Sequence, residues 1–154
     1  MGYKIDFNES IPDMINRLKQ EHVEFGLTLN NITKYNDENN INEAIETIHG
    51  MSELIIKHVV EEEARIMRII MHNAKEESAD SIKIMQEHNW VVDFLKHKLQ
   101  NMGDEIHQRD KHLQQELEQE QEIRRQIREF ITNLRNHFLE EQIIFPLALK
   151  TYSS

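Results

Sequence analysis

Apolar residues recur at every third or fourth position through most of the chain, a spacing that predicts helices with one buried face. The first stripe begins at Ile11 and continues to about Tyr35. Ser10 precedes it as a candidate N-cap, and Pro12 suits the first turn of a helix. Residues 1–10 lack the spacing, so we expect an extended lead-in followed by a first helix.

Three further helices are predicted by the same criterion. Turn-forming residues at 36–40 separate the first helix from a second, which starts near Ile41 and ends in a break at 73–78. Ser78 can cap the third helix, with Ala79–Ser81 as its first turn.

The end of the third helix is the least defined boundary. Met102–Gly103 is a weak point, and the segment from there to His112 fits either helix or loop. The fourth helix is expected from about Leu113 to Ala148. Four helices with short connections predict an all-α fold, an antiparallel up-down four-helix bundle, in a single domain over 11–150.

The composition agrees with long helices and narrows the function classes. Pro12 and Pro146 are the only prolines, and strand-favouring Val and Thr are modest in number. The net charge of −10 leaves no basic patch for nucleic acid. The absence of cysteine excludes disulfides and thiolate-ligated zinc or iron–sulfur sites. No long apolar run and no N-terminal signal segment is present, so we expect a cytoplasmic protein that is not inserted in a membrane.

One pattern of histidine and glutamate occurs twice. In each half, a Glu-His dipeptide precedes a His-x-x-x-Glu sequence on the next predicted helix. Positions i and i+4 lie one turn apart on the same helix face, so each His-x-x-x-Glu pair can direct an imidazole and a carboxylate to one point. These positions also fall in register with the apolar stripes, which places them on inward faces. The six candidate metal ligands are His22, His58, Glu62, His88, His137 and Glu141.

The donor types favour a site for two cations, whereas a site for one cation would need only some of the six residues. Neutral imidazole suits iron, zinc and copper, whereas carboxylates suit harder ions and can bridge two of them. Six donors shared by two ions leave coordination positions open for a small ligand. The two carboxylates offset only two of the four positive charges, so a bridging oxide or hydroxide is also expected.

The sequence HFLEEQ, from His137 to Gln142, resembles the HFLxEQ motif of the hemerythrin HHE cation-binding family, and the order H, HxxxE, H, HxxxE resembles that family over about 11–149. The resemblance implies that the six residues bind two iron ions, Fe²⁺ or Fe³⁺, with zinc as a substitute. It implies a non-haem di-iron protein that binds or reacts with oxygen, nitric oxide or peroxide, in stress response or iron handling. Oxygen carriers have a further histidine where this chain has Val92, so the likeness is to the six-ligand form.

Two other hypotheses fit the same residues. In one, the chain is an iron-responsive regulatory or binding module without turnover, in which metal loading stabilises the bundle and alters a partner surface. In the other, the helices form a metal-free scaffold, and apolar replacements of the six residues would be neutral or stabilising. The expected partner is a small diatomic or peroxide ligand, without nucleic acid or membrane, and the chain is either a monomer or a homodimer.

Other polar residues are interpreted from their places on the helices. Glu21 and Glu87 directly precede candidate ligands, and they are either acceptors for the ligand histidines or charged surface. His49 and His97 lie about 180° around the helix from a candidate ligand and are expected to face solvent. The sulfur-containing side chains expected to fill the core are Met51, Met67, Met71, Met85 and Met102.

Overall fold

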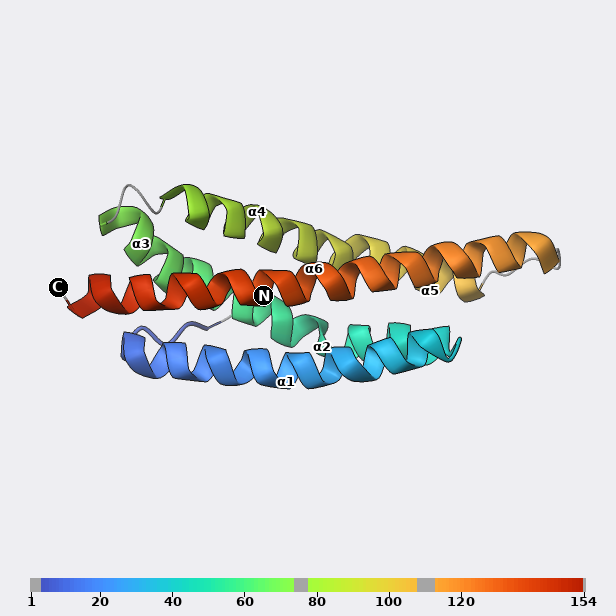
Figure 1. Cartoon of the computed structure of the whole chain (residues 1–154), viewed down its shortest axis with the longest axis horizontal. Coiled ribbons are helices and arrows are strands. Elements are labelled where there is room, and N and C mark those ends of the chain that lie inside the picture. Colours follow the sequence, from blue (N-terminus) through green and yellow to red (C-terminus); the bar gives the residue numbers. More distant parts are fainter. Residues whose placement is uncertain (1–3, 74–77, 108–112, 154) are drawn as a thin grey trace.

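The computed structural model describes residues 4–73, 78–107 and 113–153, and every regular element among them is a helix (Figure 1). In chain order the elements are α1 (Ile11–Asp37), α2 (Ile41–Glu61), the π-helical segment η1 (Glu62–Met67), α3 (Arg68–Asn73), α4 (Ser78–Asp93), the π-helical segment η3 (Phe94–Lys98), α5 (Leu99–His107) and α6 (Leu113–Ser153). The π-helical segments continue directly into their neighbours, so the elements form four long helical stretches. The all-helical prediction is confirmed for these residues.

The start of α1 has the predicted cap. The Ser10 hydroxyl accepts a hydrogen bond from the Asp13 backbone N–H at 3.2 Å, and a proline lies in the first turn. At the other end, α1 runs slightly beyond the predicted limit, to Asp37. Asn39 then adopts a positive φ of 61°, which an asparagine tolerates better than most residues, and the helix ends there.

Two predicted boundaries differ from the structure. α6 continues past Pro146 to Ser153, beyond the predicted end at Ala148. Proline cannot donate to the carbonyl of Gln142, and α6 continues without this one hydrogen bond. In the third stretch, α5 passes through Met102–Gly103 without a break, because the Met102 side chain is buried.

Two predictions fall on parts that the structure leaves out. α4 begins at Ser78 itself, and the capping role predicted for the Ser78 side chain lies outside the described residues. Between Met102 and His112, the sequence fitted either helix or loop. The structure shows helix as far as His107, where α5 ends. Residues 108–112 lie outside the described ranges.

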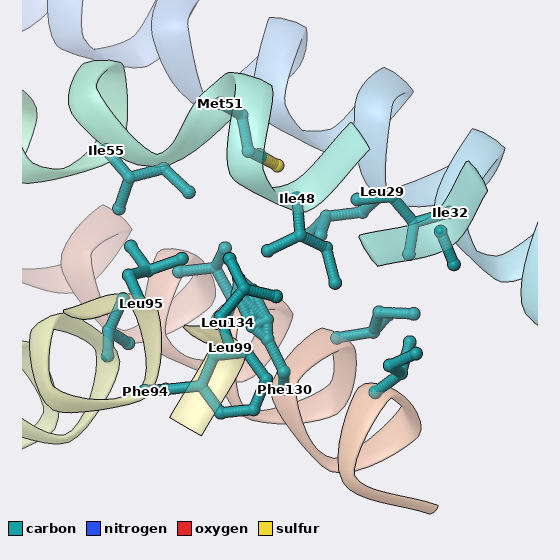
Figure 2. Close-up of a cluster of buried hydrophobic side chains, with 14 of the residues drawn as sticks. Leu29, Ile32, Ile48, Met51, Ile55, Phe94, Leu95, Leu99, Phe130 and Leu134 are labelled. Carbon is teal, nitrogen blue, oxygen red and sulfur yellow. The ribbon is translucent and has the colours of Figure 1, made fainter. Parts of the chain in front are cut away.

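The apolar core is divided into two clusters. The larger cluster draws on α1, α2, the α4–α5 stretch and α6, with Leu29, Ile48, Leu99 and Phe130 among its members (Figure 2). The smaller cluster includes Ile11, Ile15, Leu18, Ile66, Ile144 and Phe145. Along α1, the smaller cluster ends at Leu18 and the larger one begins at Phe25. A polar layer therefore crosses the molecule between the two clusters.

α6 runs along most of the long axis of the molecule, with α1 and the α4 stretch beside it (Figure 1). This helix contributes Phe138 and earlier residues to the larger cluster, and Ile144, Phe145 and Ala148 to the smaller one. None of the described helices combines the length and the apolar character that a membrane span requires.

Candidate metal centre

The six predicted ligand residues come together in the polar layer between the two clusters. α1 and the α4 stretch contribute one each, and the α2–η1 stretch and α6 contribute two each. Each side chain is buried, with an exposed fraction of 7% or less. The six residues in this layer are His22, His58, Glu62, His88, His137 and Glu141.

Within each His-x-x-x-Glu pair, the helix sets the geometry. His58 Nε2 lies 2.6 Å from Glu62 Oε1, and His137 Nε2 contacts Glu141 Oε1. Residues four apart are neighbours along one face of a helix, so the imidazole and the carboxylate meet without any distortion of the chain.

Glu141 reaches the histidines of both halves of the repeat. Its Oε2 atom lies 3.6 Å from His22 Nε2 and 3.9 Å from His58 Nε2. Its Oε1 atom lies 3.7 Å from His88 Nε2 and contacts His137 Nε2. One carboxylate oxygen therefore faces each pair of imidazoles, which is the arrangement that a carboxylate bridging two cations requires.

The donor atoms form two groups, and within each group all atoms lie within 4.8 Å of one another. The first group holds two imidazoles and two carboxylates: His22, His58, Glu62 and Glu141. The second group holds His88, His137 and Glu141. Glu62 also approaches the second group, because its Oε1 is 3.9 Å from His88 Nε2. These buried groups could hold metal ions, with Glu141 belonging to both.

The donor set also fits a cation because it is unsatisfied by protein alone. Glu62 Oε2, Glu141 Oε2 and His88 Nε2 have no hydrogen-bond partner among the described residues. Each unsatisfied buried polar group costs about 1–3 kcal/mol, and more if it is charged. A cation shared by these atoms would satisfy them together.

Two of the ligand histidines are held from outside by the glutamates that precede ligands in the sequence. Glu21 Oε1 lies 2.7 Å from His58 Nδ1, and Glu87 Oε1 lies 3.1 Å from His137 Nδ1. An imidazole that donates its Nδ1–H to a carboxylate keeps its lone pair on Nε2, the atom that faces the centre. Of the two alternatives for Glu21 and Glu87, the structure thus favours acceptors over plain surface charge.

A third outer carboxylate was not predicted. Glu63 Oε1 lies 3.1 Å from His88 Nδ1. On a regular α-helix Glu63 would be about 140° around the axis from His58 and would face away from the centre. The π-helical geometry of η1 changes this register, and the run of three glutamates at 61–63 is the only signal in the sequence.

His22 is positioned by aromatic rings instead of a carboxylate. Its ring stacks on Phe138 at a centroid distance of 4.3 Å and on Phe145 at 5.5 Å. Its Nδ1 has no hydrogen-bond partner in the described part of the chain. The four imidazoles are therefore held in two different ways.

The environment divides the histidines by charge. Burial, and then the neighbouring His58, lower the pKa of His22 to about 4. Burial likewise lowers the pKa of His137 to about 3. Burial also opposes the charged form of His58, but Glu62 and Glu21 outweigh it and raise the pKa of His58 to about 9. Two imidazoles thus offer free lone pairs at neutral pH, whereas a cation must displace a proton from His58.

The predictions for residues away from the centre are mostly confirmed. His49 and His97 are exposed. Met51, Met67 and Met102 are buried, as expected of core residues. The core prediction for Met71 is wrong, because this side chain is 38% exposed on the short α3 helix.

No family model, no curated protein and no solved structure matches the chain. The resemblance to the hemerythrin HHE family therefore rests on the residues described above.

Proposed function

We propose that the chain is a non-haem di-iron protein of the hemerythrin HHE type that binds or reacts with oxygen, nitric oxide or peroxide, in stress response or iron handling. The observation that carries this proposal is the buried set of four imidazoles and two carboxylates in two groups that share Glu141. Oxygen-rich and imidazole donors together suit iron, and no described donor in either group is a thiolate.

The proposed fold is an antiparallel up-down four-helix bundle. Hydrogen bonds between α1 and α6 support this arrangement. Arg135 donates to Asn30 at 2.6 Å, and Asn36 donates to the carbonyl of Arg124 at 3.1 Å. Residue numbers thus rise along α1 as they fall along α6, which is expected of oppositely directed neighbours.

The chain's own residues have distinct roles in this proposal. When bound, two iron ions supply one-electron redox chemistry and open coordination positions. Glu62 and Glu141 supply negative charge inside the fold, and Glu141 joins the two groups. The outer carboxylates orient the imidazoles, and the apolar clusters on both sides of the polar layer limit the access of water.

Elemental analysis and visible spectroscopy test the proposal. Protein produced with iron should contain about two iron ions per chain and absorb in the visible region; dithionite should bleach this absorption, and oxygen or nitric oxide should change it. His58→Ala and His137→Ala should lose the absorption, whereas the exposed-histidine controls His49→Ala and His97→Ala should keep it. A protein with well under one metal ion per chain would defeat the proposal.

A second candidate is an iron-responsive regulatory module without turnover. It is favoured by the origin of the donors, which come from all four helical stretches, so metal binding is coupled to the packing of the whole fold. This candidate predicts a large fall in melting temperature and a gain in protease sensitivity on chelation, with no consumption of oxygen or peroxide by the iron-loaded protein. Measurable turnover would reject it in favour of the first.

A further inference from the structure

Behind each His-x-x-x-Glu pair lies a set of three charged residues, and the two sets occupy equivalent positions in the repeat. The first triad is Arg17, Glu21 and Glu61, and the second triad is Lys83, Glu87 and Glu140. In each triad the basic residue stands four positions before the outer carboxylate, and the other glutamate directly precedes a ligand glutamate. The duplication therefore extends beyond the candidate ligands.

The first triad is built around the guanidinium of Arg17. Its Nη1 donates to Glu21 Oε2 at 2.8 Å, and its Nη2 contacts Glu61. Glu9 accepts from Nε at 3.1 Å and from Nη2 at 2.9 Å, which fills the remaining side of the planar group. The other oxygen of Glu21 lies 2.7 Å from His58 Nδ1. Arg17 therefore contacts the candidate ligand His58 only through Glu21. It restrains the Glu21 carboxylate, which in turn orients the His58 ring.

The second triad is looser. Lys83 Nζ lies 2.8 Å from Glu140 Oε1. The Lys83 side chain is 62% exposed, against 34% for Arg17. A cavity of about 460 Å³ opens on this triad, lined also by Trp90. An ammonium is a point charge on a flexible stem and restrains a carboxylate less than a guanidinium fork does.

We propose that Arg17 and Lys83 are positioning residues of the metal centre, and that Arg17 makes the His58 half the tighter of two unequal cation sites. The inference rests on the proposed metal binding. The donor groups agree with it, because the group containing His58 has four donors and the group containing His137 has three. The contact of Glu21 with His58 is also shorter, at 2.7 Å, than that of Glu87 with His137, at 3.1 Å.

Cobalt(II) titration of the metal-free protein against a competing chelator, followed by visible absorption, tests the inference. The wild-type chain should bind Co²⁺ in two steps of different affinity. His58→Ala should remove the tighter step and His137→Ala the weaker step, which assigns them. Arg17→Lys should weaken the tighter step by about tenfold and leave the weaker step unchanged. Lys83→Arg should narrow the gap between the steps.

Arg125→Lys is the matched control. Arg125 also contacts two glutamates, Glu122 and Glu129, but on the surface of α6 away from the centre. The control should bind Co²⁺ as the wild type does. If Arg17→Lys and Arg125→Lys give the same two affinities as the wild type, the inference is overturned while the proposed metal binding stands. A wild-type chain that binds no Co²⁺ overturns both.

A double-mutant cycle separates positioning from a merely structural role. Glu21→Gln should weaken the same step as Arg17→Lys, and the double variant should be no weaker than Glu21→Gln alone, because Arg17 acts through Glu21. Full additivity would contradict this. If circular dichroism shows that Arg17→Lys does not fold, Glu21→Gln decides alone, and an unchanged tighter step in that variant overturns the inference.

Discussion

Glu62 and Glu141 occupy equivalent positions in the repeat but have different neighbours. Glu62 lies 2.6 Å from His58, whose raised pKa of about 9 keeps it protonated at neutral pH. Glu141 contacts His137 and lies near His22, and burial lowers the pKa values of these histidines to about 3 and about 4. Protonated His58 is 3.9 Å from Glu141, so this carboxylate is the less compensated of the two.

Isosteric amide variants should therefore have opposite effects on the metal-free protein. Glu141→Gln should raise the free energy of unfolding by about 1 kcal/mol, because it removes a poorly compensated buried charge. Glu62→Gln should lower it, because protonated His58 loses its partner. Both variants should lose most of the stabilisation by metal. Urea unfolding with chelator and with Zn²⁺ measures this, with exposed Glu129→Gln as the control; equal destabilisation by both would contradict it.

The π-helical segment η1 distinguishes the two halves of the repeat at the level of an element. It allows consecutive glutamates to act on the centre, since Glu62 faces the donor atoms while Glu63 holds His88 from outside. α6 has no such segment, and Gln142, which stands where the repeat has Glu63, is exposed. π-helical turns inside α-helices are often found at functional sites.

Removing Glu63 should affect metal binding, and removing its counterpart should not. Glu63→Ala frees the Nδ1–H of His88 and should weaken Co²⁺ or Zn²⁺ binding by about tenfold. Gln142→Ala, the control at the equivalent position, should bind as tightly as the wild type. Competition with a chromophoric chelator gives both affinities. Equal affinities in the two variants would mean that the register of η1 has no part in the centre.

The first helix offers a test of local stability. The Ser10 cap satisfies the Asp13 backbone N–H, so Ser10→Ala should destabilise the fold by about 1 kcal/mol, and Ser10→Asp should restore most of it. Urea unfolding measures both variants. Because Ser10 makes no contact with a candidate ligand in the described contacts, metal affinity should not change; a large loss of affinity would show that the lead-in and the centre are coupled.

The sequence predicted the helices and the inward-facing donors because both depend on a regular period. His58 and Glu62 lie on the same stripe as Ile55 and Ile66, so their burial follows from the register of the helix. The role of Glu63 did not follow, because a π-helical turn breaks that register. Arg17 was also missed, since its contact with Glu61 depends on packing between segments that are distant in the sequence. The continuation of α6 beyond Pro146 was also missed, because a proline is expected to end a helix but need not do so.

At the scale of the whole molecule, the polar layer makes folding sensitive to protons. The three ligand histidines with displaced pKa values start from an ordinary value of 6.5 in the unfolded chain. His22 and His137 stay neutral in the folded chain below pH 6.5, whereas in the unfolded chain they become protonated. Acid therefore favours the unfolded chain. The pKa of His58 is raised instead. Between pH 6.5 and about 9, His58 is therefore protonated in the folded chain and neutral in the unfolded chain.

The metal-free protein should therefore be most stable near pH 6.5. As pH falls from 6.5 towards 4, stability is lost through His22 and His137, and below about 5 the carboxylates add to the loss. As pH rises from 6.5 towards 9, the contribution of His58 is lost, because its folded pKa is raised.

Saturating Zn²⁺ replaces the proton of His58, so the loss of stability above pH 6.5 should disappear while the loss below pH 6.5 steepens. Urea unfolding with chelator and with Zn²⁺, across a pH range of about 5 to 9, tests this. Metal-free protein whose stability rises steadily above pH 6.5 would contradict the charge assigned to His58.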